Sequence, residues 1–345
     1  MTDPYTVLLT AAGGDLSVQM IRQFRESSRH RITMVAVDAR DEVPARLVAD
    51  HFTTVPRGDA PGYVDALLAV VERHEVDLVL PCSDEEALAL SPAADRLAAL
   101  GAKLACAGAE TLRLLADKDA AFRFLRDHGL PTPDWRRVDR PEALEPAVLE
   151  IADRDGELAV KPARSRGSRD VCVIRSDLTG VHPHHGTREL HMDLESFLTD
   201  HMAKLVGLLP ILVMERLREP CYDVDILAFQ GEALRVVPRR RLNPVGVPFM
   251  GNVIVPCPEM IELGRKAARL FNLSWLYDLD MMSTRDGQPV IIEVNPRPSG
   301  SVTASVAAGV PLLDDLVSLA KGEDLPPLPP LRERLVLPYT GLLVS

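Results

Sequence analysis

Acidic and amide side chains on two late, strand-like segments are the residues best suited to chemistry. Asp278 and Asp280 lie two positions apart in LYDLDMM, and Glu293 and Asn295 lie two positions apart in PVIIEVN. Residues two apart in a strand share a face, and Asp286-Gly287 between the segments indicates a hairpin. Asp280 can therefore lie opposite Glu293 or Asn295, and such hard oxygen donors are typical of a Mg²⁺ site. A solvent-exposed edge carrying Asp278 and Asp280 remains the alternative interpretation.

A basic hairpin is expected earlier in the chain. The strand-like LAVKP ends at Lys161, and the polar loop after it holds three arginines together with Ser165, Gly167 and Ser168. Backbone N–H groups and hydroxyls in such a loop can surround phosphate oxygens, and Lys161 would add a fixed positive charge. An ordinary basic hairpin is the alternative if this segment acts alone.

Two further polar residues have open roles. Glu215 ends an apolar strand and could accept a hydrogen bond from an adenine amino group or pair with a nearby arginine. Lys118 lies inside a helix expected within residues 105–135, which ends at Gly129. On its own, a helical lysine indicates only a solvated side chain.

Three consecutive arginines join two strand-like segments. They cannot all face one way in a strand, so Arg239 and Arg241 share a face, with Arg240 on the other. We favour Arg239 and Arg241 as the pair that faces a cleft and binds carboxylate or phosphate, with Arg240 as the alternative. A solvated strand edge is the competing interpretation.

The segment 177–201 is rich in histidine. It contains His182, His184, His185, His191 and His201, but the spacing matches no strong zinc pattern. We therefore interpret it as an insertion beside the basic hairpin, followed by an amphipathic helix that packs on the fold.

Strands and helices alternate in the first third of the chain. This order indicates a parallel sheet covered by helices. Gly13 and Gly14 follow the first strand and Asp38 ends the second, but the spacing differs from G-x-G-x-x-G, which favours a tight turn over a dinucleotide site. Ser83, Asp84 and Glu85 follow a third strand and either line a substrate pocket or cap the next helix.

Composition sets the broad class. The 345 residues predict two or three structural units. A net charge of −11 gives no general attraction for nucleic acid or an anionic membrane. Five scattered cysteines without a CxxC pair fit reduced thiols in a cytoplasm, and neither a spanning apolar run nor a secretory signal is visible.

Several segments together, in order, resemble the ATP-grasp superfamily. The similarity is to carboxylate–amine ligases related to the large subunit of carbamoyl-phosphate synthase. It covers nearly the whole chain and is carried by VDLVLPCSDEEALAL, LACAGAETLRLLADKDAAFRFLRDHGLPTP, LAVKPARSRGSRDV, LVMERL and VIIEVNPRPSGS. The resemblance implies an α/β chain with a Rossmann-like pre-ATP-grasp domain at 1–115. A small lid subdomain at 116–210 and a catalytic subdomain at 211–345 would form the two-part α+β ATP-grasp fold.

The resemblance also implies roles for individual residues. Lys118, Lys161 and the loop Ser165, Gly167 and Ser168 would contact ATP phosphates, and Glu215 and the backbone of Leu217 would meet adenine. Asp280, Glu293 and Asn295 would hold Mg²⁺ or Mn²⁺, and Arg297 would steady the transferred phosphate. The chain departs from the family in having Ser165 and Asp170 where glycine is common. Cys221 stands where a carboxylate near the ribose is often found, so ribose recognition passes to Glu219 or elsewhere.

The implied activity is ATP-dependent joining of a small carboxylic acid to an amine, through an acyl phosphate, with release of ADP and phosphate. An amino acid or a specialised metabolite is the expected acid, and a homodimer is the expected assembly if the chain has one. Two other classes are alternatives: a non-catalytic ATP-binding or regulatory protein with this fold, and a nicotinamide-dependent oxidoreductase. The glycine spacing argues against the oxidoreductase.

Overall fold

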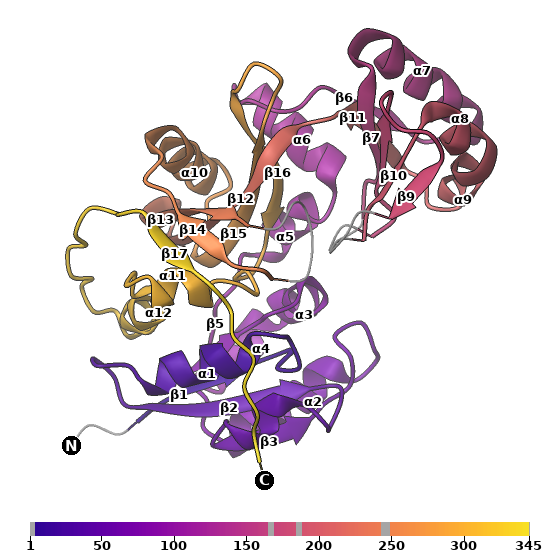
Figure 1. Cartoon of the computed structure of the whole chain (residues 1–345). Coiled ribbons are helices and arrows are strands. Elements are labelled where there is room, and N and C mark those ends of the chain that lie inside the picture. The colour runs from indigo at the N-terminus through magenta and orange to yellow at the C-terminus, as the bar shows by residue number, and fades with distance from the viewer. Residues whose placement is uncertain (1–3, 165–168, 184–187, 243–248, 345) are drawn as a thin grey trace.

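The computed structural model describes residues 4–164, 169–183, 188–242 and 249–344. Its strands form three sheets with helices packed around them (Figure 1). The predicted α/β class, with a Rossmann-like unit followed by an ATP-grasp architecture, is confirmed. Within the described residues no helix combines the length and apolar character needed to cross a membrane.

The first sheet is wholly parallel, with strand order β3-β2-β1-β4-β5. Short apolar runs become its three central strands, which are largely buried because helices cover both faces of the sheet. Its elements are β1 (Tyr5–Leu9), α1 (Ser17–Arg25), β2 (Ile32–Asp38), η1 (Pro44–Leu47), β3 (His51–Thr54), α2 (Tyr63–Arg73), β4 (Leu78–Leu80), α3 (Asp84–Leu90), η2 (Ser91–Ala93), α4 (Ala94–Ala99) and β5 (Lys103–Leu104).

The second sheet has the order β6-β11-β7-β8-β10-β9. The expected hairpin around Lys161 is present as an antiparallel β7–β8 pair. The histidine-rich segment differs from the expected insertion, because its described residues supply two strands to this sheet. The elements are β6 (Trp135–Val138), η3 (Pro141–Ala143), α7 (Leu144–Asp155), β7 (Glu157–Pro162), β8 (Cys172–Arg175), β9 (Val181–Pro183), β10 (Leu190–Met192), α8 (Leu194–Ser196), the π-helical turn η4 (Phe197–His201), α9 (Met202–Val206) and β11 (Ile211–Glu215).

The third sheet is antiparallel, with strand order β16-β15-β12-β13-β14-β17. The expected hairpin between the two carboxylate-bearing strands is its β15–β16 pair. The elements are β12 (Arg218–Phe229), β13 (Glu232–Arg241), β14 (Asn252–Ile254), α10 (Pro258–Leu270), β15 (Trp275–Ser283), β16 (Pro289–Asn295), α11 (Thr303–Ala307), α12 (Leu312–Lys321) and β17 (Arg334–Val336).

The helix expected within residues 105–135 is instead two helices. They are α5 (Ala109–Leu115) and α6 (Lys118–Asp127). Asp117 between them has extended backbone angles, and its carboxylate accepts from the N–H groups of Asp119 and Ala120 at 3.1 and 3.2 Å. This N-cap starts a new helix at Lys118, so Lys118 lies at a helix N-terminus and not in a helix interior.

The buried apolar residues form several clusters, which connect the three sheets to different extents. One cluster joins Val7 and Leu9 of the first sheet to Leu227 and Val237 of the third. A separate cluster is drawn wholly from residues 138–213 and includes Val160, Ile174 and Ile211, all in the second sheet. The first and third sheets therefore share a core. One face of the second sheet has a core of its own, whereas Leu212 and Met214 belong to a further cluster that includes residues of the third sheet.

Replacing Gly264 by Val is expected to lower the free energy of unfolding by about 1–3 kcal/mol. Gly264 lies where α10 packs on the third sheet, and a Cβ there would approach Val236 and Ile226 to 3.0 and 3.1 Å. Thermal and denaturant unfolding measure the change. The matched control is Gly207→Val at an exposed site whose nearest atom would be 3.6 Å away. Equal losses in both variants would contradict the close packing of α10.

Candidate active site

One face of the third sheet carries many of the polar side chains predicted from the sequence. In the strand register Asp280 lies opposite Glu293, and Asp278 lies opposite Asn295. The neighbouring strand β12 places Asp223 beside Asp280 and Asp225 beside Asp278. We call this face, together with the arginines of β13, the polar face. Its residues are Asp223, Asp225, Arg239, Arg241, Asp278, Asp280, Glu293 and Asn295.

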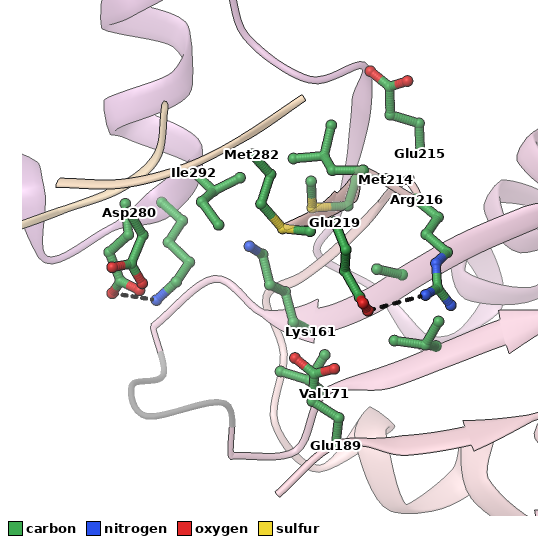
Figure 2. Close-up of a pocket in the computed structure, with 15 residues that line it drawn as sticks. Lys161, Val171, Glu189, Met214, Glu215, Arg216, Glu219, Asp280, Met282 and Ile292 are labelled. Atoms are coloured by element: carbon green, nitrogen blue, oxygen red, sulfur yellow. Dashed lines mark ion pairs between the residues drawn. The ribbon is translucent and has the colours of Figure 1, made fainter. Parts of the chain in front are cut away.

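A cavity of about 790 Å³, including its open mouth, lies between the second and third sheets. Lys161 extends into its middle, with Met282 on one side and Val171 and Glu189 on the other (Figure 2). Its size falls in the range of ordinary cofactor sites. The lining residues are Lys118, Ala159, Lys161, Val171, Val173, Glu189, Met214, Glu215, Arg216, Leu217, Glu219, Asp280, Met282, Ile292 and Glu293.

Lys118 connects α6 to the polar face. Its side chain is 7% exposed, and its Nζ lies 3.0 Å from Glu293 Oε1. Residue spacing could not indicate this contact, because it joins a helix start to a strand far along the chain. The pair places a buried ammonium between the cavity and the carboxylates.

Lys161 projects from β7 into the same space. Burial lowers the pKa of its ammonium to about 8, and repulsion from Lys118 acts in the same direction. Two lysines thus face one cavity, an arrangement that suits a polyanionic ligand.

In the structure the side chain of Glu215 binds a backbone group, which is neither of the two contacts expected for it. Its Oε1 accepts from the backbone N–H of Asp134 at 2.9 Å, and its own N–H donates to the Asp134 carbonyl at 3.0 Å. The side chain points away from Lys161 in Figure 2. The neighbouring Arg216 pairs with Glu219 at 3.6 Å, so the arginine beside Glu215 has a different partner.

Apolar side chains form the other walls of the cavity. Val171 and Val173 come from the second sheet, Met282 and Ile292 from the third, and Leu217 from the connection between them. Leu217 was expected here from the resemblance. Valine, isoleucine and methionine are ordinary core residues in a sequence, so nothing in their spacing marked the other four as cavity walls. Together they suit a flat, weakly polar ring.

Arg239 differs from its expected position facing a cleft. Its side chain is fully buried, and two of its nitrogens bind Asp225 at 2.8 and 2.9 Å. The remaining Nη1 donates to Asn252, Ser301 and Asp223. The guanidinium is therefore filled by partners inside the sheet, which corrects the expectation that it is open to substrate.

Arg241 does share the face of Arg239, as the spacing predicted. Its Nη2 binds Asp280 Oδ1 at 2.8 Å and also contacts Asp223 Oδ1. The Arg241 side chain is 15% exposed, and its ion pair orients Asp280. Arg240, the alternative, lies opposite Tyr222 in the register and on the other side of the strand.

Arg297 links the polar face to the first sheet's domain. Its Nε lies 2.9 Å from Asp84 Oδ1, at the start of α3. Ser83 caps this helix by accepting from the Glu86 N–H at 3.3 Å. Of the two roles expected for this loop, capping belongs to Ser83, whereas Asp84 also lines a second cavity described below.

The remaining sequence candidates are placed as follows. Ser165, Gly167 and Ser168 lie outside the described residues, as do His184 and His185. His191 pairs with Glu189 at 3.5 Å, and the described residues contain no histidine metal cluster.

Asp38 accepts from the Gly13 N–H at 2.7 Å, and a Cβ at Gly13 would lie 2.8 Å from that carboxylate. This glycine therefore makes the tight turn favoured from its spacing.

Asp280, Glu293 and Asn295 offer the oxygen donors expected for Mg²⁺. Burial raises the pKa of Asp280 to about 6, with Arg241 opposing the rise. Burial and the neighbouring Asp223 raise the pKa of Asp278 well above its ordinary value. Carboxylates that resist ionisation in this way are stabilised by a cation, so the donor set fits a divalent ion. Asp223 and Asp225 were not singled out from the sequence, because only the register of β12 brings them here.

Two family models match separate parts of the chain. Residues 7–105 match the PylC-like N-terminal domain, and residues 208–339 match an ATP-grasp family described as belonging to a biosynthetic pathway with the Ter operon. No curated protein sequence matches significantly. The chain belongs to the ATP-grasp superfamily.

Solved structures share the fold at low sequence identity. An ADP complex of N5-carboxyaminoimidazole ribonucleotide synthetase matches with a TM-score of 0.71 and 17% identity, covering 98% of this chain and 82% of that one. The L-amino acid ligase of Bacillus licheniformis matches with 0.66 and 15%, covering 93% and 75%. The biotin carboxylase domain of Hydrogenobacter thermophilus 2-oxoglutarate carboxylase, with MgADP and bicarbonate, matches with 0.65 and 18%, covering 94% and 71%.

The Lys161 ammonium is expected to titrate near pH 8 in the ligand-free protein, whereas an exposed lysine titrates near 10.4. The Lys161 ammonium is charged below about pH 8 and neutral above it. Anion binding in the cavity is therefore expected to weaken as the pH rises through about 8. NMR of ¹³C-methylated lysines measures the value, with Lys161→Met assigning the signal.

Lys118→Met provides the control for the cause. Removing the neighbouring charge is expected to raise the pKa of Lys161 while the burial effect remains. If every lysine signal in the wild-type protein titrated above pH 10, the described burial of Lys161 would be wrong.

Proposed function

We propose that this protein is an ATP-dependent, ADP-forming ligase that joins a carboxylic acid to an amine. The observation that carries the proposal is the convergence of Lys118 and Lys161 with Asp280 and Glu293 on one cavity. Cations for phosphate and hard oxygens for a divalent ion are the two requirements of phosphoryl transfer from ATP. The ligases among the fold relatives support the same class.

In this proposal the nucleotide lies along the cavity. The adenine ring packs between apolar walls that include Met214, Met282 and Ile292, near Glu215 and the backbone of Leu217. The phosphates extend toward Lys161 and Lys118. Glu219, beside Arg216 at the far end of the cavity, is suited to accept from ribose hydroxyls in place of Cys221, which is fully buried. The solved structures with bound ADP support a nucleotide in this fold.

Asp280, Glu293 and Asn295 would hold Mg²⁺ beside the phosphates. The ion would supply positive charge that offsets the charge of the phosphate oxygens. Lys118 is well placed to exchange its Glu293 partner for a phosphate oxygen, which would free Glu293 as a ligand. Arg241 would keep Asp280 oriented, and Arg239 would act as a positioning residue that fixes Asp223 and Asp225.

The reaction has two balanced steps. A carboxylate oxygen of the acid attacks the γ-phosphorus, and the bond from that phosphorus to the β–γ bridging oxygen breaks, giving an acyl phosphate and ADP. The amine then attacks the acyl carbon, loses a proton, and phosphate leaves. Lys161, Arg297 and the backbone around them position charge and need no covalent chemistry of their own.

The acid is proposed to enter through a second cavity. This cavity, about 1080 Å³ with its open mouth, shares Lys118 and Glu293 with the first. Leu88, Leu115 and Val294 give it apolar walls, and Arg113 and Arg164 stand at its basic side. Apolar walls beside cations suit an acid with an apolar body, such as an amino acid or a related metabolite.

Asp280→Asn and Glu293→Gln are each expected to lower kcat by at least about a hundredfold, because each removes a charge that the transferring phosphoryl group depends on. The measurement is ADP release from Mg-ATP in the presence of a pool of amino acids and carboxylic acids. Mass spectrometry of the same mixtures identifies products formed with loss of water.

Asp286→Asn, in the exposed turn of the same hairpin, is the matched control and is expected to keep full activity. If the protein binds ATP but releases no ADP in the presence of any acid, the ligase proposal is contradicted and the non-catalytic alternative is favoured. Release of ADP that no acid stimulates would also contradict it.

Arg113→Ala is expected to raise KM for the acid about tenfold, through loss of a charge-assisted hydrogen bond, with KM for ATP unchanged. Arg113 is exposed and makes no ion pair within the part of the chain that the structure describes. Steady-state kinetics with an acid found in the screen test this. Arg265→Ala, on the exposed side of α10, is the control. If KM for the acid and KM for ATP rose together, the acid would not bind at Arg113 in the second cavity.

A further inference from the structure

The start of α6 connects the two sheets that enclose the cavity around Lys161. The Lys118 N–H donates to the carbonyl of Ala163, directly after β7, at 3.0 Å. The Lys118 side chain pairs with Glu293 of β16, and α6 runs beside that strand (Figure 1). One residue of α6 therefore contacts the end of β7 through its backbone and the third sheet through its ammonium.

Asp117, directly before α6, makes a second contact with the segment after β7. Its Oδ2 accepts from Arg164 Nε at 3.1 Å, while its Oδ1 caps α6 and lies 3.6 Å from Arg137 Nη1. The Asp117 side chain is 10% exposed, and that of Arg164 is 72% exposed. Two consecutive residues, Asp117 and Lys118, thus bind two consecutive residues, Ala163 and Arg164. We call these two contacts the latch.

Capping of α6 does not require the contact between Asp117 and Arg164. A cap needs only a side-chain acceptor, which asparagine or serine supplies equally well. The ion pair adds little to stability, because one partner is largely in solvent. What the latch does fix is the position of Lys118 relative to Lys161, which lies two residues before Ala163.

Phe122 connects the same helix to the second lysine. It lies four residues after Lys118, on the same face of α6, and is 1% exposed. The centroid of its ring lies 5.8 Å from Lys161 Nζ, a distance at which the ring face attracts an ammonium. One face of α6 therefore contacts both lysines, so a shift of this helix would change the distance between them.

We propose that Asp117 is a positioning residue that, through the latch, sets the spacing of Lys118 and Lys161 for the phosphates of the nucleotide. This inference rests on the proposed function and deepens it, because it names the residue that places the two cations before the ligand arrives. Lys118 lines both cavities and Arg164 lines the second, so the latch lies where the nucleotide and the acid would meet.

The test compares Asp117→Asn and Arg164→Lys by calorimetric titration with Mg²⁺–AMP-PNP and with adenosine, without acid or amine. The first variant keeps the helix cap, and the second keeps the positive charge but loses the planar guanidinium that Asp117 binds. Each is expected to raise Kd for Mg²⁺–AMP-PNP about fivefold. Kd for adenosine is expected to stay unchanged, because adenosine carries no phosphate. The double variant is expected to lose no more than either single variant, since both remove one contact.

A purely electrostatic role of Asp117 predicts the opposite result for Asp117→Asn. Loss of an anion beside Lys118 would strengthen the binding of phosphates. The matched control is Asp119→Asn, which removes an equal charge from the same turn of α6. The ion pairs of Asp119 are with Arg123 and Arg137, so this variant is expected to keep Kd for Mg²⁺–AMP-PNP within about twofold.

Three outcomes overturn the positioning role: unchanged or tighter binding of Mg²⁺–AMP-PNP in Asp117→Asn, losses that multiply in the double variant, or an equal loss of adenosine affinity. Arg164 is exposed, so if Asp117→Asn failed to fold, an unchanged Kd in Arg164→Lys would overturn the role by itself. If the wild-type protein bound no Mg²⁺–AMP-PNP, the proposed function would fail and this inference with it. Wild-type binding with unaltered variants would refute the inference alone.

Discussion

The polar face of the third sheet depends on one balance of charge. Five buried or half-buried carboxylates lie on adjacent strands, and carboxylates out of water remain ionised only beside cations. Arg239 and Arg241 supply part of this charge from within the sheet, and Lys118 supplies more from the start of α6. Arg297 lies close enough to act on Asp278, Asp280 and Glu293 as well, and the charge of the site is set by what these four cations leave unneutralised.

This balance explains why the cavity is built from two sheets. The third sheet supplies the excess of anions, and β7 of the second sheet supplies Lys161 across the gap. Burial lowers the pKa of the Lys161 ammonium and raises the pKa of the Asp280 carboxyl, so it disfavours the charged form of both groups. A ligand that carries both phosphate and a divalent ion relieves both groups at once. The geometry therefore favours binding of the two together over binding of either alone.

Local periodicity was enough to predict the hairpin that sets Asp280 against Glu293, since alternation along a strand needs only neighbouring residues. It also placed Arg239 and Arg241 on one face. It could not show that Asp223 and Asp225 lie beneath them, because that contact depends on the register between strands formed by distant segments. For the same reason Arg239 was expected to face substrate when it is in fact enclosed. Lys118 was misplaced because a single aspartate, Asp117, divides an otherwise continuous helical pattern.

The ion pair between Arg297 and Asp84 has a consequence for how this architecture can be recombined. Asp84 belongs to the N-terminal unit, yet it neutralises a guanidinium at the end of a strand that bears two candidate ligands. A chimera that imports another N-terminal unit would remove the ion-pair partner of Arg297 in that unit unless an acid returned at this one position. Exchange of this unit is therefore constrained by electrostatics at a helix start far outside the strands of the polar face.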